Sequence, residues 1–393
     1  MGSLSTCTLR KRNLGRFLLI TPFGQLLGQL RRRAGLGLRT FAELVDERAS
    51  TVSAIECGMR TPWHRQETLS LVADVLGLVS SSPFCDEFFQ SARNTNSDGG
   101  SVKQPPPGML GWWWTTDHAS ALDQRAIQDL AEFIGATSGI SAEYSADETA
   151  TAARELTRYP ALTELAAEWR VRKLLGRREA QFAAAPVDVE AVLENQAGVR
   201  LEIIPGLIPH FSVQACAVMR SGEITLLVDR IVADSRPLAS YRELLARCYA
   251  PRALWIDAAK DLPADWFLEL QQTEDWPQLL RDCERFALSM LLPAAPVLSA
   301  ASSAYREVVE QQGWVETDTA ACAVRNRLAE QFAVPPLLVH TRLVRWPCHV
   351  YGRIAQALAA EEFELPPVDW FEVQEEPRQQ LLFEKSEPVP QLP

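Results

Sequence analysis

The sequence predicts an α+β fold that is mostly α-helical. Apolar residues recur at helical spacing through most of the 393 residues, whereas three short apolar runs between 199 and 228 are typical of strands. A stretch rich in serine, glycine and proline near residue 100 separates an N-terminal helical block from the rest of the chain. The length and the 47% hydrophobic content therefore fit two or three globular domains with sizeable cores.

Residues 1–90 are predicted to form a domain of four to five short helices. Phe23, Leu26, Leu27 and Leu30 line one face of the first helix, and Gly35 stands where a helix commonly ends in a left-handed conformation. Further helices are expected at 41–45, 50–56 and 67–76, with a turn at 46–48. Two short helices joined by a tight turn are typical of the helix-turn-helix motif.

A linker is expected at 91–110, followed by a helical connecting region at 111–173. Residues 94–101 are polar and rich in glycine and serine, which indicates flexibility, and the proline run at 105–107 indicates a stiffer end. Trp112, Trp113 and Trp114 follow directly, and three consecutive indoles cannot all face one core. They form either an exposed aromatic platform or a wedge that packs the linker against the next domain.

The remaining chain is predicted to be a mixed domain at 174–365 and an acidic, proline-rich tail at 366–393. Strands are expected at 199–204, 212–219 and 223–228, the last two joined by a turn at 220–222. Helices are expected at 238–249, 276–292, 319–332 and 336–344. The last two could form a second helix-turn-helix, although such a pair also suits the end of a domain of the kind described below.

The charge is distributed unevenly along the chain. The net charge is −11, yet residues 1–80 alone carry eleven Lys and Arg against six Asp and Glu. A basic module on an acidic body presents phosphate groups with one favoured face. The eight cysteines show no C-x-x-C pair, which favours reduced thiols in a cytoplasm, and we expect neither a targeting segment nor a membrane anchor.

The N-terminal block resembles the Xre family, which contains the lambda-type repressor and Cro helix-turn-helix domains. The resemblance covers about 60 residues, of which Ala42, Val52 and the sequence Ile55-Glu56-x-Gly58-x-Arg60 are characteristic. Asp46 departs from the pattern, because the family usually has a glycine in this turn, and Glu47 falls where the family usually has a buried apolar residue. The other matching residues are Phe23, Leu26, Leu27, Leu30, Arg31, Ala34, Gly35, Ser53, Pro62, Leu71, Ala73 and Leu76.

This resemblance implies a recognition helix at 49–56 that lies in the major groove of double-stranded DNA. Its small side chains would face base edges and offer few bidentate contacts. The arginines around it are expected to contact phosphates and to set the register. The alternative is a helical module that only mediates protein contacts. The predicted DNA-binding residues are Arg31, Arg39, Arg48, Ala49, Ser50, Thr51, Ser53, Ala54 and Arg60, with a basic arm at Arg10, Lys11, Arg12 and Arg16.

Residues 174–346 resemble the ImmA/IrrE family, whose members often follow an Xre domain and commonly carry a zinc-dependent peptidase. The match includes 186–191, 198–199, the strands to Val228, 286–293 and 328–334. The resemblance implies a zincin-like fold of helices and a small sheet. Active members carry H-E-x-x-H on a helix after the strands, because two histidines four residues apart can bind one zinc ion.

Here Arg247 and Pro251 stand at the histidine positions and Cys248 at the glutamate position, while Asp282 is kept as the carboxylate ligand. A guanidinium cannot be deprotonated to bind a metal, and proline has no donor atom. We therefore expect no metal, no cofactor and no peptidase activity. An ion pair between Arg247 and Asp282 could replace the metal, and Cys248 could belong to an unrelated site but is more simply a small buried residue.

The sequence thus predicts a cytoplasmic transcriptional regulator that binds double-stranded DNA and is not an enzyme. A homodimer is expected because Xre-type domains commonly bind two-fold operators, and the C-terminal domain would bind a small-molecule or protein effector. Two alternatives remain. One is a metallopeptidase of unusual ligation that cleaves a repressor, and the other is an antitoxin-like autoregulator that binds a protein partner.

Overall fold

The computed structural model describes residues 22–63, 65–78, 83–94, 108–116, 122–138, 142–143, 164–175, 186–220, 223–235, 238–256, 276–345 and 347–368. The chain divides into two compact units. Unit 1 consists of Met1–Tyr144 and Ala197–Asp234, and unit 2 of Ser145–Gln196 and Ser235–Pro393. This division differs from the predicted domains, because the strands between 199 and 228 belong with the N-terminal helices and not with the helices that follow them.

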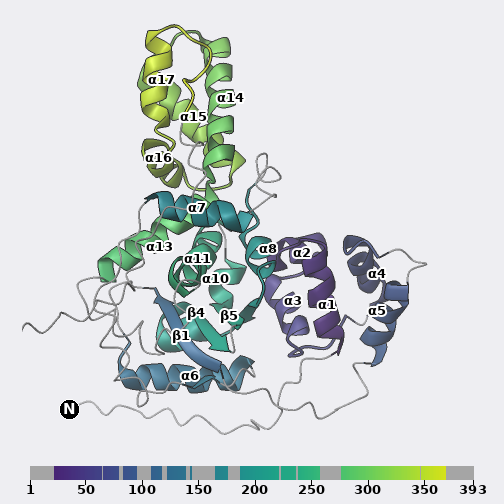
Figure 1. The fold of residues 1–393 in the computed structure, drawn as a ribbon. Helices are drawn as coiled ribbons and strands as arrows, with labels where there is room; N and C mark the ends of the chain where they lie inside the picture. Colours follow the sequence, from purple (N-terminus) through teal and green to yellow (C-terminus); the bar gives the residue numbers. More distant parts are fainter. Residues whose placement is uncertain are drawn as a thin grey trace, which may run out of the picture. The chain divides into compact units, whose positions relative to one another are not determined.

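The N-terminal part of unit 1 consists of α1 (Pro22–Arg33), α2 (Leu38–Leu44), α3 (Ala49–Glu56), α4 (Gln66–Val75) and α5 (Pro83–Asn94). They are the purple and blue helices of Figure 1. Their apolar faces meet in one core, and glycines in the left-handed conformation end the helices α1, α3 and α4. The predicted helices are confirmed. The main core residues are Phe23, Leu27, Leu38, Phe41, Val52, Ile55, Val72 and Phe88.

Unit 1 also contains a mixed sheet with the strand order β2-β1-β4-β5-β3. Strand β4 pairs antiparallel with both β1 and β5, whereas β3 pairs in parallel with β5 and β1 in parallel with β2. The three predicted strands are confirmed, and β3 lies at one edge of the sheet. Residues 221–222 of the predicted turn lie outside the described residues. The strands are β1 (Gly108–Thr115), β2 (Ala142–Glu143), β3 (Val199–Ile204), β4 (Val213–Arg220) and β5 (Glu223–Asp229).

Trp112, Trp113 and Trp114 lie in β1, where they face small residues of β4. Successive side chains of a strand point to opposite faces of the sheet, so three consecutive indoles can be buried only if both faces are covered. All three are buried here. Their packing role is therefore confirmed, and the interpretation as an exposed platform is wrong. The prediction of a helical region at 111–173 is corrected for its first residues, which form this strand.

The described residues of unit 1 also include the helices α6 (Gln124–Ser138), α9 (Leu207–Phe211) and α10 (Arg230–Asp234). Helix α6 packs against β2, β3 and α9. Gly206 begins α9 with φ 97°, and a Cβ atom there would lie 2.8 Å from the ring of Phe133 on α6. Glycine is therefore needed both for the turn and for the close approach of the two helices.

Unit 2 is helical throughout its described residues. Helix α11 packs against α8 and α13, and α14, α15, α16 and α17 pack against one another in a bundle, drawn in green and yellow in Figure 1. Helices α11, α13, α15 and α16 confirm the sequence prediction, whereas α14 and α17 were not predicted. The bounds are α7 (Glu164–Leu175), α8 (Val189–Glu194), α11 (Leu238–Pro251), a π-helical turn (Arg252–Ile256), α13 (Trp276–Leu291), α14 (Ala294–Gln312), α15 (Thr317–Gln331), α16 (Pro336–Val344) and α17 (Val350–Ala359).

A buried polar network joins three helices of unit 2. Arg342 on α16 forms an ion pair with Glu168 on α7 and donates through Nε to the Leu292 carbonyl, 2.9 Å away. The hydroxyl of Ser289 on α13 donates to the same carboxylate at 2.6 Å. Buried charges are tolerated when hydrogen bonds replace their lost hydration, and the Glu168 carboxylate has two such partners here, Arg342 and Ser289.

Some predictions fall at the limits of the described residues. The predicted linker at 91–110 begins inside α5 and ends inside β1, while 95–107, the basic arm at 10–16 and residues 369–393 of the predicted tail lie outside. Within the described ranges, no single helix combines the length and apolar character of a membrane span. Helices α13 and α14 meet that criterion only as a pair that is bent by 56°.

Candidate nucleic-acid interface

Helices α2 and α3, with the turn between them, cover the residues predicted to form a helix-turn-helix. Asp46 in the turn has φ 55°, so this aspartate adopts the left-handed conformation that glycine adopts most readily. Glu47, at the other departure from the family pattern, accepts a hydrogen bond from Trp63 Nε1 at 2.9 Å. The two departures are therefore accommodated locally, and α3 begins at Ala49, the predicted start of the recognition helix.

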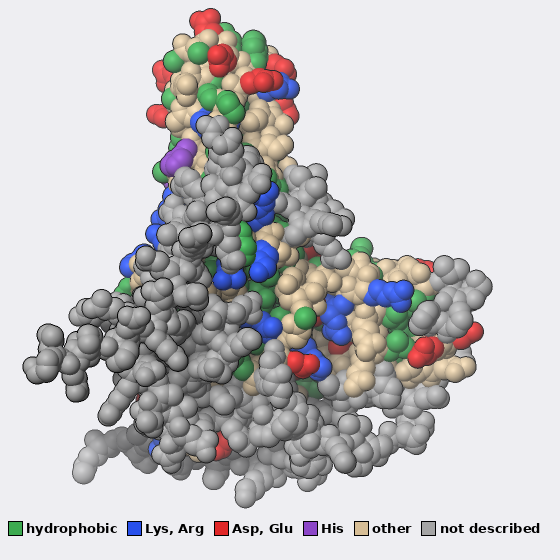
Figure 2. Space-filling model, in the orientation of Figure 1, with side chains coloured by type: hydrophobic (Ala, Val, Ile, Leu, Met, Phe, Trp, Pro, Cys, Tyr) green, Lys and Arg blue, Asp and Glu red, His purple; other side chains and the backbone are tan. Residues whose placement is uncertain are grey.

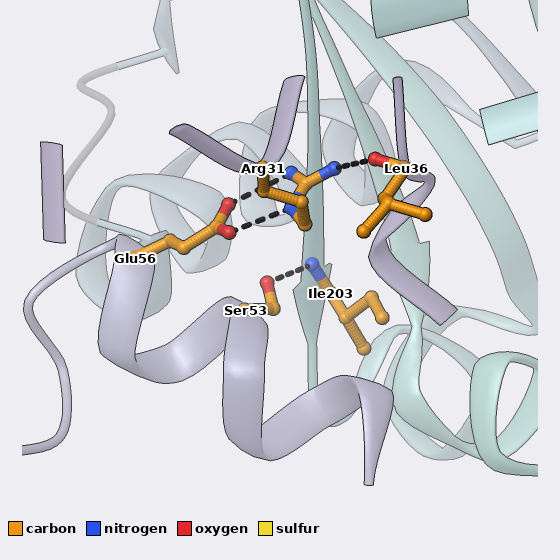
Figure 3. A network of polar contacts seen from close by, with 5 residues as sticks. All are labelled: Arg31, Leu36, Ser53, Glu56 and Ile203. Carbon is orange, nitrogen blue, oxygen red and sulfur yellow. Dashed lines mark hydrogen bonds and ion pairs between the residues drawn. The ribbon is translucent and has the colours of Figure 1, made fainter. Parts of the chain in front are cut away.

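Arg31 fixes the first helix of this domain to the third. The side chain is 0% exposed, and its guanidinium binds both carboxylate oxygens of Glu56, with Nε–Oε1 and Nη2–Oε2 distances of 2.7 and 2.9 Å. Nη1 donates to the Leu36 carbonyl at 2.9 Å (Figure 3). The prediction that Arg31 contacts phosphate is therefore wrong, because this cation is buried and neutralised inside the domain.

Glycines on α1 allow this close packing. A Cβ atom at Gly24 would lie 2.5 Å from the carbonyl oxygens of Ile55 and Glu56, and one at Gly28 would lie 3.2 Å from the Glu56 carboxylate. Helices α1 and α3 thus approach each other closely at the point where the ion pair forms. The C-terminal end of α3 is held closely to α1.

The face of α3 that was predicted to read bases packs against the sheet of the same unit. Ala49 is buried, and Ser53 is only 1% exposed. The backbone N–H of Ile203 in β3 donates to Ser53 Oγ at 2.9 Å (Figure 3). The expectation that Ala49 and Ser53 point outward is corrected, because both side chains lie on protein in this structure.

Helix α10 holds the other end of the motif. Arg39 on α2 is 8% exposed and donates through Nη1 to the Ala233 carbonyl at 2.6 Å. The hydroxyl of Ser50 donates to Asp234 Oδ2 at 3.0 Å. Arg39 and Ser50, both predicted to contact DNA, therefore bind the protein's own chain here.

The remaining predicted contacts differ in exposure. Arg48 and Arg60 are exposed, and Ala54 is half-buried. Thr51 is buried and accepts a hydrogen bond from Arg60 Nη1 at 3.3 Å. Among the predicted phosphate contacts that the structure describes, Arg48 and Arg60 are thus the two whose side chains reach solvent.

A buried carboxylate lies beside α3. Glu202 on β3 accepts a hydrogen bond from the Cys57 thiol, and its Oε2 has no hydrogen-bond partner among the described residues. Burial raises the pKa of Glu202 from 4.5 to about 7, while Arg200 and the Cys57 thiol oppose the shift and Glu56 adds to it. Burial, followed by the charges of Glu202 and Glu56, raises the pKa of Cys57 well above its usual value.

The residues predicted to stand at degenerate metal positions lie on α11 and α13. Arg247 forms an ion pair with Glu243 one turn earlier, Cys248 is buried, and Pro251 closes the helix. Asp282 is buried and accepts hydrogen bonds from Gln278 and Arg285, at 3.0 and 3.2 Å. Arg247 and Pro251 offer no lone pair to a metal, so these residues do not fit the zinc site of the ImmA/IrrE family.

Arg247 and Asp282 nevertheless both affect one group, the Cys283 thiol on α13. Burial raises the pKa of the Cys283 thiol, Asp282 raises it further, and Arg247 lowers it. Arg247 and Asp282 therefore lie near the same thiol, and a direct ion pair between them stays a prediction. No cluster of three or more potential metal ligands occurs in the part of the chain that is described.

No family model, curated protein or solved structure matches this chain. Its function must therefore be inferred from its own residues and their geometry. Sequence reasoning missed the two interactions that define the α3 environment, namely the Arg31–Glu56 pair and the Ser53–Ile203 hydrogen bond. The one available signal was the unusually small side chains on α3, which suit close packing as well as a groove.

Proposed function

We propose that this chain is a transcriptional regulator that binds double-stranded DNA through α3. The observation that carries the proposal is the α2–turn–α3 arrangement inside a helical domain, with α3 fixed to α1 by the Arg31–Glu56 pair. A recognition helix needs a rigid support, because its side chains must meet base edges within a few tenths of an ångström. This domain supplies such a support.

The charge of the domain favours the same function. Residues 1–80 carry an excess of five positive charges on a chain with a net charge of −11. Arg48 immediately precedes α3, and Arg60 follows it by one turn, so both are suited to contact the phosphates on either side of a groove. Lys and Arg side chains also lie on the face of the helical domain seen at the right of Figure 2.

Unit 2 would serve as a non-catalytic body that binds an effector or a second copy of the chain. Arg247 and Pro251 supply no ligand for zinc, and Cys248 is buried at the former glutamate position. Peptidase chemistry of the ImmA/IrrE type is therefore not part of the proposal. A homodimer that binds a two-fold operator is the expected assembly.

The direct test is selection of duplexes from fragmented genomic DNA by the full chain at low salt. Enriched sequences with two-fold symmetry are expected. The variants Arg48→Gln and Arg60→Gln should each weaken binding to every selected duplex and lower the salt slope by about 1, since each removes one phosphate contact. The exposed Arg306→Gln in unit 2 is the matched control. Absence of any binding at low salt, both in the wild type and in the Ala233→Trp variant of the next section, would overturn the proposal.

The second candidate is a helical module that serves protein contacts alone. It is favoured by one observation, the burial of Ala49 and Ser53 on the chain's own sheet. This candidate predicts that no variant of the chain binds DNA, even when α3 is separated from β3. The experiments of the next section distinguish the two.

A further inference from the structure

We infer that the packing of α3 on β3 and α10 is an intramolecular clasp that keeps the recognition helix off DNA until it is released. The clasp consists of Arg39, Ser50 and Ser53 on the helix-turn-helix side and of Ile203, Ala233 and Asp234 on the other side. The inference rests on the proposed function, because it assigns the regulation of the same site.

The first argument is that one helix face serves both roles. Ala49, Ser53 and Cys57 follow one another at intervals of four residues and lie on one side of α3. That side includes the positions predicted to meet base edges, and it is buried on β3. A helix face cannot lie in the major groove and on a strand at once, so DNA binding and the clasp exclude each other.

The second argument is the way in which the clasp is built. Strand β3 is an edge strand, and Ile203 uses its N–H, which points away from β5, to bind a serine hydroxyl. The other two contacts are hydrogen bonds to α10, from Arg39 to the Ala233 carbonyl and from Ser50 to the Asp234 carboxylate. Such bonds are individually weak, since water replaces them when the contact opens. The clasp covers the sheet edge but can be released without unfolding either partner.

The third argument is the carboxylate enclosed in the contact. Glu202 neighbours Ile203 and has one oxygen without a hydrogen-bond partner among the described residues. The charged and titratable groups around it are Cys57 and Glu56 from α3 and Arg200 from β3. An incompletely paired carboxyl group costs free energy when it is buried, so the closed clasp is weakened from within.

The test introduces the same bulky side chain at two positions of α10 in the full chain. Ala233→Trp places an indole in the buried contact with α3, whereas Ile231→Trp places it at a position that is 55% exposed. Ala233→Trp should bind the selected duplexes at least tenfold more tightly than the wild type, and Ile231→Trp should bind as the wild type does. Hydrogen exchange at Ile203 should be faster in Ala233→Trp alone.

A reversible lock tests the same contact without destabilising it. The double variant Ser50→Cys with Asp234→Cys places two thiols where a hydrogen bond of 3.0 Å now joins the side chains. Under oxidation the disulfide should reduce DNA binding at least tenfold, and a reductant should restore it. The two single-cysteine variants should respond to neither treatment. This experiment remains decisive if Ala233→Trp fails to fold.

The outcomes separate the two proposals. DNA binding that is equal in the wild type, in Ala233→Trp and in the oxidised lock would overturn the clasp and leave the proposed function intact. Absence of binding in all of them, with faster exchange at Ile203 in Ala233→Trp, would overturn the proposed function and the inference with it. Tighter binding on release and loss on locking would support both.

Discussion

Two polar contacts that join distant parts of the chain differ in how their buried carboxylates are paired. In unit 2, Arg342, Glu168 and Ser289 form a buried network, with a backbone carbonyl as a further acceptor. In unit 1, α3 meets β3 through single hydrogen bonds beside Glu202, one oxygen of which has no partner among the described residues. The first contact is suited to permanent structure, and the second to a contact that opens.

The largest effect is expected where the permanent network is broken. Arg342→Met leaves the Glu168 carboxylate buried without its cation and with the Ser289 hydroxyl as its donor, which should reduce the free energy of unfolding by ~3–5 kcal/mol. Urea unfolding of the full chain measures this change. Arg306→Met, which removes an exposed ion pair with Glu364, should cost less than ~1 kcal/mol. Equal losses in both variants would contradict the assignment of Arg342 as a structural residue.

The next effect concerns the pH dependence of the clasp. Because burial raises the pKa of Glu202 from 4.5 to about 7, the closed clasp binds this proton more tightly than the open one. The protonated Glu202 carboxyl group therefore adds its full contribution to the opening free energy of the clasp below about pH 4.5, and this contribution is lost as the pH rises through 7. The opening free energy at Ile203, obtained by hydrogen exchange, should fall by up to ~3 kcal/mol between pH 5 and pH 8.

Glu202→Gln is the matched variant for this measurement, because it keeps the shape of the side chain and removes its titration. Its opening free energy should stay constant over the same pH range. The same pH dependence in wild type and Glu202→Gln would show that another group controls the contact.

A smaller effect is expected from the hydroxyl that covers the strand edge. Ser53→Ala leaves the Ile203 N–H without its acceptor in a buried place, which should lower the opening free energy by ~1–3 kcal/mol. Ser70→Ala on the exposed side of α4 is the control and should have no measurable effect. If exchange at Ile203 is unchanged in Ser53→Ala, the hydrogen bond contributes nothing to the clasp.

The smallest effect is expected at the exposed end of the clasp. Ser50→Ala removes a hydrogen bond to Asp234 that lies in solvent, where water replaces it, so the opening free energy should fall by only ~0.5 kcal/mol. The same exchange measurement detects this difference. A loss as large as that of Ser53→Ala would place the main support of the clasp at α10 and not at β3.

Local sequence pattern was sufficient for much of the fold. The helices of the N-terminal block, the strands from 199 to 228 and several helices of unit 2 follow from apolar periodicity and from glycines at helix ends. Helix α14 was missed because alanine and serine fill much of it, which leaves few large apolar residues to reveal its period. Strand β1 was missed because an all-buried strand lacks the alternation that marks a half-exposed one.

The site could not be predicted to the same extent, since its contacts join residues far apart in the sequence. Arg31 is indistinguishable from a surface arginine until Glu56, 25 residues later, is placed beside it. Ser53 meets Ile203 across 150 residues, and no local pattern indicates this pairing. The sequence therefore predicted helix α3 but not the surface of the protein against which this helix packs.

The most direct measurement of the central claim is hydrogen exchange at the Ile203 amide in the full chain, with and without a selected duplex. The account predicts slow exchange in the free protein and clearly faster exchange in the DNA complex, because α3 must leave β3 to enter the groove. Exchange that stays equally slow while DNA is bound would contradict the account, since α3 would then remain on the sheet.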